Sequence, residues 1–335
     1  MKIFVTGGTG FIGRHLVWRL ADAGHQVLFS GRNAANATEI IRQSRAAVCW
    51  IPLQHGSSDA AATLIRATQD CAAIVHCAAL SAPWGTPQAF ARANLDSCAE
   101  VLQACHANQV KRLVHLSTPS LYFDFRDRLG IREDESLPAP VNEYVRTKAM
   151  AETLVHEAGL DEAVILRPRA VFGPWDSALI PRLIRVIQRG AIPLMRGGRA
   201  QLDLTCIDNL IHAVELSLTQ PLPRALCTYN VSNGTPLTFK ALIHSVAEQF
   251  QLTVRTRRLP WRLVDVIARV METGARLRNS GEPLLTRHTA GVLAFSQTLD
   301  LNAIRDELGY HPVVSQDDGI RLHAQWWLAR QGAQR

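Results

Sequence analysis

The sequence has 335 residues, of which 47% are hydrophobic and 19% are charged, and its formal net charge is +7. This composition is that of an ordinary globular protein, and it excludes a disordered or low-complexity chain. The positive charges are spread along the sequence without the basic stripe and interleaved aromatic residues of a nucleic-acid binder, so we expect no nucleic-acid partner.

Seven cysteines are an odd number, lie far apart and form no CxxC pair. They argue against a disulfide framework or a zinc site and favour a reducing compartment. The twelve histidines contain no HxxxH or HExxH pattern, so no catalytic metal is expected. The first strand begins at the N-terminus, with no room for a signal peptide, and no apolar run can span a bilayer. We therefore expect a cytoplasmic protein.

The N-terminus has the pattern of one βαβ unit. A short apolar run ends in glycines, and an amphipathic segment and a second apolar run follow at residues 11–23 and 26–29. Gly7 permits a tight turn, Gly10 lets the backbone approach a pyrophosphate, and Gly13 lets the helix pack closely on the strand. The positive end of that helix then faces the phosphates. The unit therefore predicts a dinucleotide-binding site.

Strands and helices go on alternating in the next part of the chain. Further strands are expected at residues 46–53, 72–79, 110–116 and 163–167. Further helices are expected at residues 33–44, 60–68, 90–108 and 142–158. The run at 72–79 is apolar throughout, which is typical of a parallel strand buried on both faces. The alternation predicts an α/β fold with a doubly wound parallel sheet of the Rossmann type.

The pattern loosens after residue 170. We expect a turn at 171–175, a helix at 179–189, a strand at 202–207, a helix at 209–218 with Asp208 as its N-cap, and a strand at 228–231. The remainder is mostly helical. The chain then divides into a dinucleotide-binding domain, residues 1–170 with about 203–232, and a smaller substrate lobe, residues 171–202 and 233–335.

Tyr144 and Lys148 lie four residues apart on an expected helix, so their side chains point the same way. A neighbouring ammonium and an oxidised nicotinamide ring both favour the phenolate, which suits the pair to proton transfer. An isolated pair of this spacing would be an exposed helix surface. Here Thr118 follows the strand at 110–116, at the sheet edge where active sites of open α/β sheets lie. The three residues therefore indicate a catalytic site.

At this point the chain resembles the extended short-chain dehydrogenases/reductases over nearly its full length. Residues 6–13 match the family's phosphate turn, Tyr144 and Lys148 match its catalytic pair, and Thr118 matches its catalytic Ser/Thr. Ser117 and Ser120 are near alternatives to Thr118. The passages most similar to the 3β-hydroxysteroid dehydrogenase and 2-alkyl-3-oxoalkanoate reductase branch are residues 79–85, 117–120 and 308–312.

The resemblance implies a cofactor site and a substrate site. The cofactor-binding residues it implies are Gly7, Thr9, Gly10, Phe11, Ile12, Gly13, Arg32, Ala78, Ala79, Asn94, Tyr144, Lys148, Pro168, Arg169 and Val171. The substrate residues it implies are Ser81, Trp84 and Ser120. Where the family often has a Gly-Asp-Leu segment whose Asp contacts the adenine, this chain has residues 51–55, which leaves the adenine contact open.

The end of the second strand bears on the cofactor. NAD-preferring members of the family carry an acid there, which binds the ribose hydroxyls. This chain has Gly31 followed by Arg32. An uncharged glycine does not repel a 2′-phosphate, and a guanidinium can bind it bidentately. The pair favours NADP, with NAD as the alternative, although a loop arginine can also be merely solvated.

Three functions are open from the sequence. The first is an NADP-dependent oxidoreductase that acts on a secondary alcohol or ketone of an apolar substrate such as a sterol or a long 3-oxo acid, and we expect it to be a homodimer. The second is a nucleotide-sugar epimerase or dehydratase that holds NAD. The third is a non-catalytic NADP-binding redox sensor, a class that usually lacks the Tyr144 and Lys148 pair.

Residues 259–278 form a basic amphipathic segment. One face carries the apolar residues Leu263, Val266, Ile267, Val270 and Met271, and arginines lie elsewhere. Such a helix can lie on a membrane surface, which would make the protein a peripheral membrane partner. The commoner role is to cover a core or an apolar pocket.

Overall fold

The computed structural model describes residues 1–278 and 281–332. Its main feature is a seven-stranded sheet in the order β12-β7-β5-β4-β1-β2-β3, in which every pair of neighbours is parallel. The strands are β1 (Lys2–Thr6), β2 (Gln26–Gly31), β3 (Val48–Pro52), β4 (Ala73–His76), β5 (Arg112–Leu116), β7 (Glu162–Pro168) and β12 (Leu226–Val231). The predicted doubly wound parallel sheet is confirmed.

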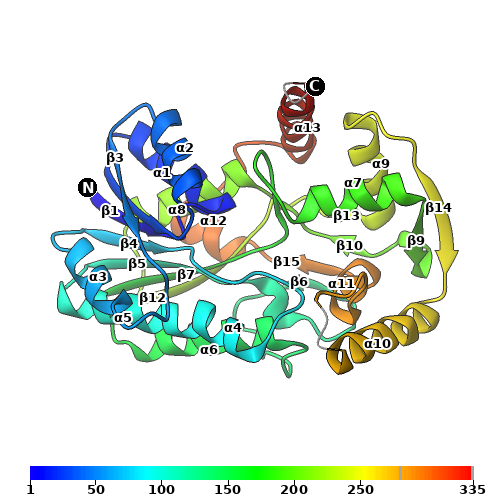
Figure 1. Cartoon of the computed structure of the whole chain (residues 1–335), viewed down its shortest axis with the longest axis horizontal. Helices are drawn as coiled ribbons and strands as arrows, with labels where there is room; N and C mark the ends of the chain where they lie inside the picture. Colours follow the sequence, from blue (N-terminus) through cyan, green and yellow to red (C-terminus); the bar gives the residue numbers. More distant parts are fainter. Residues whose placement is uncertain (279–280, 333–335) are drawn as a thin grey trace.

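Helices cover both faces of this sheet (Figure 1). On one face lie α1 (Phe11–Asp22), α2 (Ala34–Gln43) and α8 (Ile207–Thr219), and on the other lie α3 (Ala60–Ala67), α5 (Ser97–Ala107) and α6 (Glu143–Glu157). The pleat of β1 shows how one strand serves both layers, since Ile3 and Val5 belong to one hydrophobic cluster and Phe4 to the other. The expected helix at 90–108 is continuous from α4 (Pro87–Phe90) through a π-helical turn (Ala91–Asp96) into α5.

A lobe of helices and short strands adjoins the carboxyl ends of the sheet (Figure 1). Its four-stranded sheet has the order β13 (Leu237–Thr238), β10 (Gln201–Leu202), β15 (Gln297–Leu299) and β6 (Arg128–Ile131). Two strand pairs are β8 (Val171–Phe172) with β11 (Thr205–Cys206), and β9 (Ala191–Met195) with β14 (Arg255–Leu259). The helices are α7 (Leu179–Arg189), α9 (Phe239–Gln249), α10 (Trp261–Leu277), α11 (Arg287–Ala294), α12 (Asn302–Leu308) and α13 (Gln316–Gly332).

Three details of the second half differ from the sequence prediction. The strand expected at 202–207 is divided between β10 and β11, which belong to different sheets. The turn at 171–175 contains β8. Helix α8 begins at Ile207 with Cys206 at the N-cap, so Asp208 lies in the first turn and is not the cap. The cause is that the Cys206 N–H donates to Asn233 Oδ1, which lets β11 pass directly into the helix.

The chain order does not follow the sheet order at one edge. Strand β12 pairs with β7 along its whole length, although residues 169–225 separate the two strands. Most of that separating segment belongs to the lobe or to α8. The edge of the large sheet is therefore completed by a late part of the chain.

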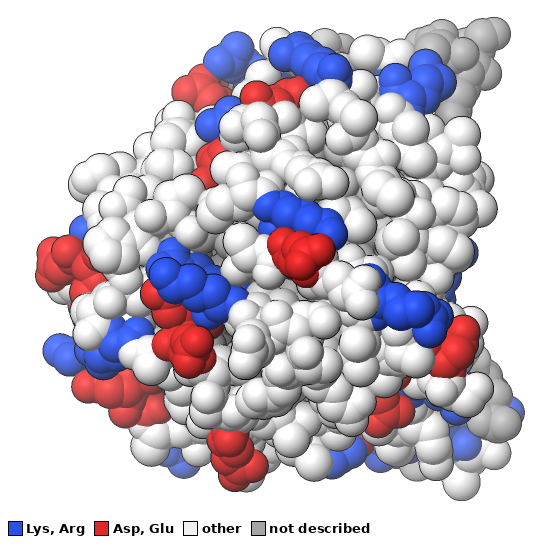
Figure 2. Space-filling model, turned by 90° about the vertical axis from the view of Figure 1, so that its left-hand side faces the viewer, with Lys and Arg blue, Asp and Glu red and all other residues white. Residues whose placement is uncertain are grey.

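All seven cysteines are free. None of the helices in the described ranges is long and apolar enough to cross a membrane. Figure 2 shows the face nearest the outer end of the sheet, where positive and negative side chains are intermixed and form no patch of one sign.

Candidate active site

The predicted site residues gather at one edge of the seven-stranded sheet. Because all strands are parallel, their carboxyl ends meet at the same edge. Strands β1, β4, β5 and β7 end there at Thr6, His76, Leu116 and Pro168. The chain order reverses between β1 and β4, and ligands of open α/β sheets bind at such a point.

The glycine turn after β1 has space only for backbone. Gly7 has a φ of +65°, and a Cβ added there would lie 2.9 Å from the backbone of Ala78. A Cβ on Gly13 would lie 2.3 Å from the Gly7 carbonyl oxygen. Gly10 is the N-cap of α1 with no side-chain cap, and the first turn holds no acid. The Gly8 and Gly10 N–H groups donate to the carbonyl oxygens of Ser30 and Gly7, but the first N–H groups of an α-helix have no partner within the helix. The start of α1 therefore offers donors to an anion, and the residues fit a pyrophosphate.

The end of β2 has no room for an acid. A Cβ on Gly31 would lie 2.1 Å from Thr9 Oγ1, and Thr9 is held in turn by Asn36, whose Nδ2 donates to its carbonyl oxygen at 3.3 Å. Arg32 is exposed. The packing of Thr9 thus leaves no space for an acidic side chain at position 31, and the next residue, Arg32, carries a guanidinium.

Residues 51–55, which stand where the resembled family often has an acid that contacts the adenine, are bound to helix α5. Leu53 is buried, and His55 Nδ1 contacts Glu100 Oε2 at 2.6 Å. Glu100 also accepts the Gly56 N–H at 2.8 Å. This segment is therefore fixed to helix α5 by a carboxylate that the sequence prediction did not include.

Lys148 is buried against the end of β5. Helix α6 begins after Asn142, whose Oδ1 accepts the Val145 N–H at 2.9 Å, and it carries Lys148 on its sheet-facing side. The Lys148 Nζ donates to the Leu116 carbonyl oxygen at 2.6 Å and to His115 Nε2 at 3.3 Å. Burial lowers the pKa of Lys148 to about 8. The ammonium is thus held just before Ser117 and Thr118.

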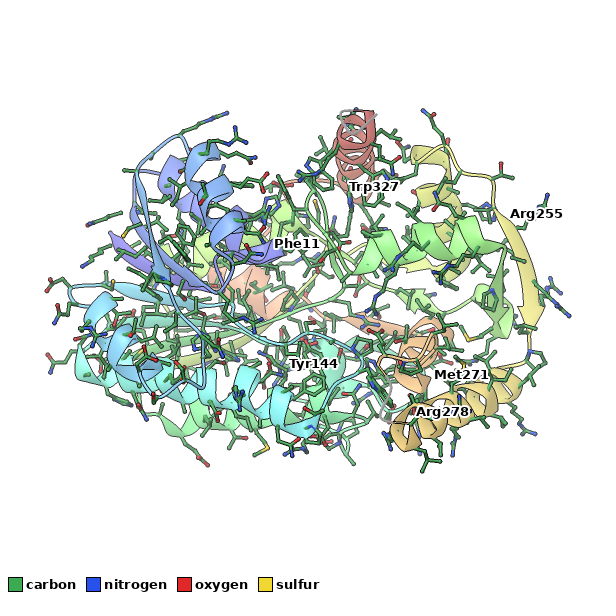
Figure 3. The ribbon with its side chains drawn as sticks, in the orientation of Figure 1. Phe11, Tyr144, Arg255, Met271, Arg278 and Trp327 are labelled. Carbon is green, nitrogen blue, oxygen red and sulfur yellow. The ribbon has the colours of Figure 1, made fainter. Side chains whose placement is uncertain are left out.

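Among the described residues, the hydroxyl protons of Tyr144 and Thr118 have no acceptor. The half-buried Tyr144 ring lies 6.5 Å from the Phe90 ring, centroid to centroid, and within the described residues its hydroxyl has no hydrogen bond. Figure 3 shows Tyr144 between the large sheet and the lobe. Thr118 is buried, and its Oγ1 accepts the Ser120 N–H at 3.2 Å, so its proton stays free. Ser117 Oγ is buried without a partner among the described residues.

Asn94 connects the loop after β4 with helix α6. Its Oδ1 accepts the Leu80 N–H at 2.7 Å, and its Nδ2 donates to Thr147 Oγ1 at 2.9 Å. Thr6 Oγ1 accepts the N–H groups of Cys77 and Ala78, both at 3.1 Å. These bonds end β4 at His76, earlier than the expected 72–79 strand, and bring Ala78 and Ala79 to the glycine turn.

The remaining predicted residues lie in the loop after β4, in the segment after β5 and at the end of β7. Ser81 is exposed, Trp84 lies under the Arg276 guanidinium at 5.6 Å from its ring centroid, and Ser120 is buried. Pro168 and Arg169 are buried at the end of β7, followed by Val171, which is half-buried.

Arg169 has titratable neighbours that the sequence prediction did not include. Burial lowers the pKa of Arg169 to about 10, with Asp203 acting in the opposite direction. His288 is also buried, and burial, followed by the Arg169 charge, lowers its pKa to about 4. Asp203 and His288 come from the loosely patterned second half of the chain, so no local spacing pointed to them.

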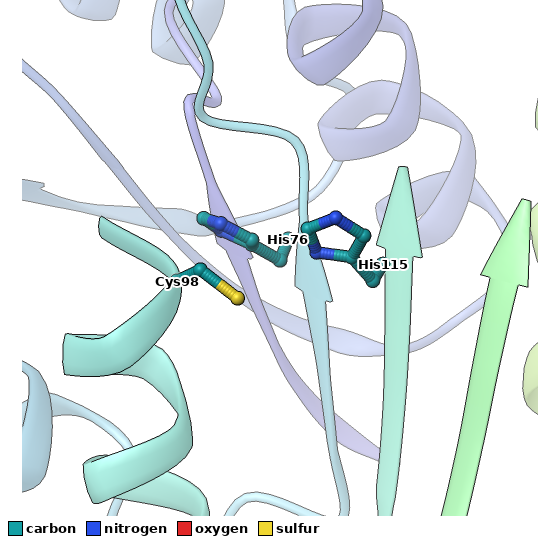
Figure 4. Close-up of side chains that lie close together, drawn as sticks. All are labelled: His76, Cys98 and His115. Carbon is teal, nitrogen blue, oxygen red and sulfur yellow. The ribbon is translucent and has the colours of Figure 1, made fainter. Parts of the chain in front are cut away.

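A buried group behind Lys148 was also missed. His76 on β4, Cys98 on α5 and His115 on β5 converge, with one ligand-type atom of each within 4.8 Å of the others (Figure 4). Their distant positions give no sequence motif. Burial lowers the pKa of both histidines well below the usual range and raises that of Cys98 to about 11.

The hydrogen bonds of this group do not suit a metal ion. Thr6 Oγ1 already accepts two N–H groups, so it donates its own proton to His76 Nδ1 at 2.7 Å. The His76 proton is then on Nε2. His115 Nε2 accepts from Lys148, which puts the His115 proton on Nδ1. An adjacent ammonium and two protonated ring positions oppose a bound cation, so the group packs behind Lys148.

Comparison with known proteins gives matches along nearly the whole chain. The model of the NAD dependent epimerase/dehydratase family matches residues 3–232. The uncharacterized protein YbjS of Escherichia coli is 34% identical over 97% of this chain and 97% of its own length. A 2-alkyl-3-oxoalkanoate reductase of Stenotrophomonas maltophilia is 32% identical over 96% of this chain and 98% of its own. DesIV, a dTDP-glucose 4,6-dehydratase of Streptomyces venezuelae solved with NAD bound, is 25% identical, with a TM-score of 0.76 and coverage of 99% of this chain and 98% of that one.

Proposed function

Because this chain belongs to the NAD dependent epimerase/dehydratase family, we propose that it is an NADP-dependent reductase that interconverts an apolar ketone and its secondary alcohol. The family and its relatives make it a nicotinamide-dependent oxidoreductase of the extended short-chain dehydrogenase/reductase type. The non-catalytic sensor is therefore set aside. The observation that carries the proposal is the buried Lys148 ammonium on the carbonyl oxygen of Leu116, two residues before Thr118 and one helical turn after Tyr144. In the part of the chain that the structure describes, the hydroxyl protons of Tyr144 and Thr118 have no acceptor.

We propose the following roles for these side chains. When bound, the nicotinamide cofactor supplies or accepts the hydride. In the reducing direction, the Tyr144 hydroxyl donates its proton to the ketone oxygen. The Thr118 hydroxyl donates a hydrogen bond to the same oxygen, because a ketone oxygen can only accept and the Thr118 proton is not used in the bond with the Ser120 N–H. The Lys148 ammonium stabilises the phenolate that Tyr144 becomes, which makes the proton easier to lose.

We propose that residues 1–170 and about 203–232 hold the cofactor and that residues 171–202 and 233–335 hold the substrate, with β6 of the first range joining the sheet of the lobe. The turn from Gly7 to Gly13 would bind the pyrophosphate, and Arg32 the 2′-phosphate. The residues proposed to flank the ribose and nicotinamide are Ala78, Ala79, Tyr144, Lys148, Pro168, Arg169 and Val171. Asn94 would act through the loop that it holds.

The cofactor proposal is tested by exchanging one charge. In Arg32→Asp, the Kd for NADP should rise by about 10- to 100-fold, because a charge-assisted contact is replaced by repulsion, whereas the Kd for NAD should change little. Arg42→Asp, an exposed arginine on α2, is the matched control. Tighter binding of NAD than of NADP by the unaltered protein would overturn the proposal.

The substrate proposal is tested by assaying NADPH consumption with 2-alkyl-3-oxo acids and with 3-oxosteroids. The similarity to 2-alkyl-3-oxoalkanoate reductases supports the first class. The similarity to DesIV supports a second candidate function, a nucleotide-sugar epimerase or dehydratase. That enzyme would convert a UDP- or dTDP-sugar with no net consumption of cofactor, so product analysis distinguishes the two.

A homodimer and a cytoplasmic location also remain proposals. Light scattering at several protein concentrations tests the first. Fractionation of cells that express the chain at its natural level tests the second.

A further inference from the structure

Helix α10 exposes half of its apolar side chains. Its buried residues are Val264, Ala268 and Ala275, and Val264 packs in a small cluster with Ala290 and Ala294 of α11. Five apolar side chains on another face are 42% to 83% exposed, namely Leu263, Val266, Ile267, Val270 and Leu277. The helix does cover a small core, but it does so with Val264, Ala268 and Ala275. Most residues of the apolar face predicted from the sequence are exposed.

The exposed residues form one continuous stripe. Their spacings of three, four and seven residues place them along one side of the helix. Contiguous exposed apolar surface of this kind marks an interaction site in a soluble domain. We call Leu263, Val266, Ile267, Val270 and Leu277 the α10 stripe.

The charges around the α10 stripe are mostly of one sign. The exposed arginines of α10 and of the preceding strand β14 include Arg255, Arg257, Arg258, Arg262, Arg269 and Arg276. The two acids of the helix turn toward α11. Asp265 is 15% exposed and accepts from Arg269 and Arg287, and Glu272 accepts the Arg287 N–H at 2.7 Å. The outward-facing charge is therefore positive.

One end of the α10 stripe lies close to the proposed active site. The Arg276 guanidinium is 5.6 Å from the centre of the Trp84 ring. The next residue, Gly85, is packed so closely that a Cβ there would lie 3.0 Å from the Phe90 ring. Phe90 in turn contacts Tyr144, at 6.5 Å between ring centres. A few side-chain contacts thus join the helix to the catalytic tyrosine.

We propose that α10 and β14 dock on an anionic lipid surface. The α10 stripe would enter the interface between headgroups and acyl chains, and the arginines would bind the lipid phosphates. Figure 1 places both elements at the outer edge of the lobe, and in Figure 3 Arg255 points away from the molecule. An enzyme of apolar ketones would then meet its substrate at the surface where such molecules accumulate. The docking itself does not depend on the proposed reaction.

The same features disfavour a second copy of the chain on this surface. A two-fold interface places the same patch of each subunit against itself. The arginine rows of two copies would then face each other without acids to neutralise them, because Asp265 and Glu272 are already engaged with α11. An anionic membrane supplies the missing negative charge.

The test is sedimentation with vesicles, in the absence of substrate and cofactor. The unaltered chain should bind vesicles of phosphatidylcholine with phosphatidylglycerol at least about tenfold more tightly than phosphatidylcholine alone, and salt should weaken that binding. Val266→Ser/Val270→Ser should reduce it by more than about tenfold, because each valine loses an apolar contact. Arg258→Gln/Arg262→Gln should reduce it by about 25-fold, at about fivefold for each charge.

The matched control is Leu322→Ser/Leu328→Ser, which removes two exposed apolar residues from α13, on the other side of the molecule (Figure 1). This variant should bind as the unaltered chain does. Equal binding to both kinds of vesicle, or unchanged binding of Val266→Ser/Val270→Ser, would overturn the proposal. A dimer that the latter variant loses would show instead that a second copy covers the α10 stripe. Unchanged activity on a soluble substrate shows that the variants fold, and it keeps this test separate from that of the reaction.

Discussion

At the glycine turn after β1, a Cβ added to Gly13 would lie 2.3 Å from a backbone oxygen, whereas nothing lies within 4 Å of a Cβ added to Gly274 on α10. The ion pairs of the large sheet and of the lobe also differ in how much of them is exposed to solvent. The Arg167–Glu152 pair behind the large sheet is 6% and 4% exposed, and the Arg182–Glu282 pair of the lobe is 40% exposed on both sides. The sheet edge is thus fixed by close contacts that permit few changes, while the lobe surface can vary and so can set specificity.

The largest effect should come from removing one oxygen at the sheet edge. Tyr144→Phe keeps the ring beside Phe90, so the fold should be unchanged, but it removes the proposed proton donor. We expect kcat to fall by about 10²- to 10⁴-fold. Steady-state kinetics with NADPH measure this, and circular dichroism confirms the fold. Turnover at the original rate would show that the fixed edge is not where the chemistry occurs.

The two ion pairs test the comparison directly. Glu152→Gln leaves the Arg167 guanidinium buried without its bidentate carboxylate, and we expect the free energy of unfolding to fall by about 3 kcal/mol or more. Glu282→Gln breaks the exposed pair and should cost about 0–1 kcal/mol. Urea denaturation of both variants provides the measurement. Equal costs would mean that burial does not separate the two regions.

Lys148 gives a prediction about pH. Because burial lowers its pKa from 10.5 to about 8, the folded chain binds this proton less tightly than the unfolded chain does. Below about pH 8 both states are protonated and the full cost of burial is present; it disappears as the pH rises from about 8 to 10.5. Lys148→Met carries no such cost. Its stability relative to the unaltered chain should therefore decrease by about 3 kcal/mol between about pH 7 and pH 10.5.

This change is measured by denaturation of the cofactor-free proteins at several pH values. Lys111→Met, at an exposed lysine before β5, is the control and should show no such trend. If the stability of Lys148→Met relative to the unaltered chain increased with pH, the predicted sign would be wrong.

A pair of glycine substitutions should have smaller effects than the changes at the buried Glu152 and Lys148. Gly13→Ala forces its Cβ onto the Gly7 carbonyl oxygen and should destabilise the chain by about 1–3 kcal/mol, with weaker cofactor binding. Gly274→Ala, in an open helical position, should stabilise by about 0.5–1 kcal/mol. Opposite signs in thermal denaturation would support the comparison, and a loss of stability in both variants would count against it.

The parts that the sequence predicted are those with local patterns. The βαβ unit and the alternation of strands and helices follow from short periodic runs, and the structure has them, although β4 ends at His76 and not at residue 79. The roles of Tyr144 and Lys148 come from a four-residue spacing and remain a prediction. Strands of two or three residues, such as β10 and β13, have no period, and Asp208 resembled a cap because the bond from Cys206 to Asn233 is non-local.

The candidate active site also contains residues that no local sequence pattern could predict. Glu100, Asp203 and His288 reach it from distant parts of the chain, so only the folded structure brings them there. For α10, the spacing defined an apolar face, but it could not show which residues meet a neighbour and which meet solvent.

The late position of β12 has a consequence for synthesis. Until residues 226–231 have left the ribosome, β7 has an unpaired edge, with residues 169–225 already made. An unpaired strand edge is a template for association with other chains. A nascent chain that stops before Leu226 should therefore aggregate or recruit a chaperone, whereas one that extends beyond Val231 can close its sheet.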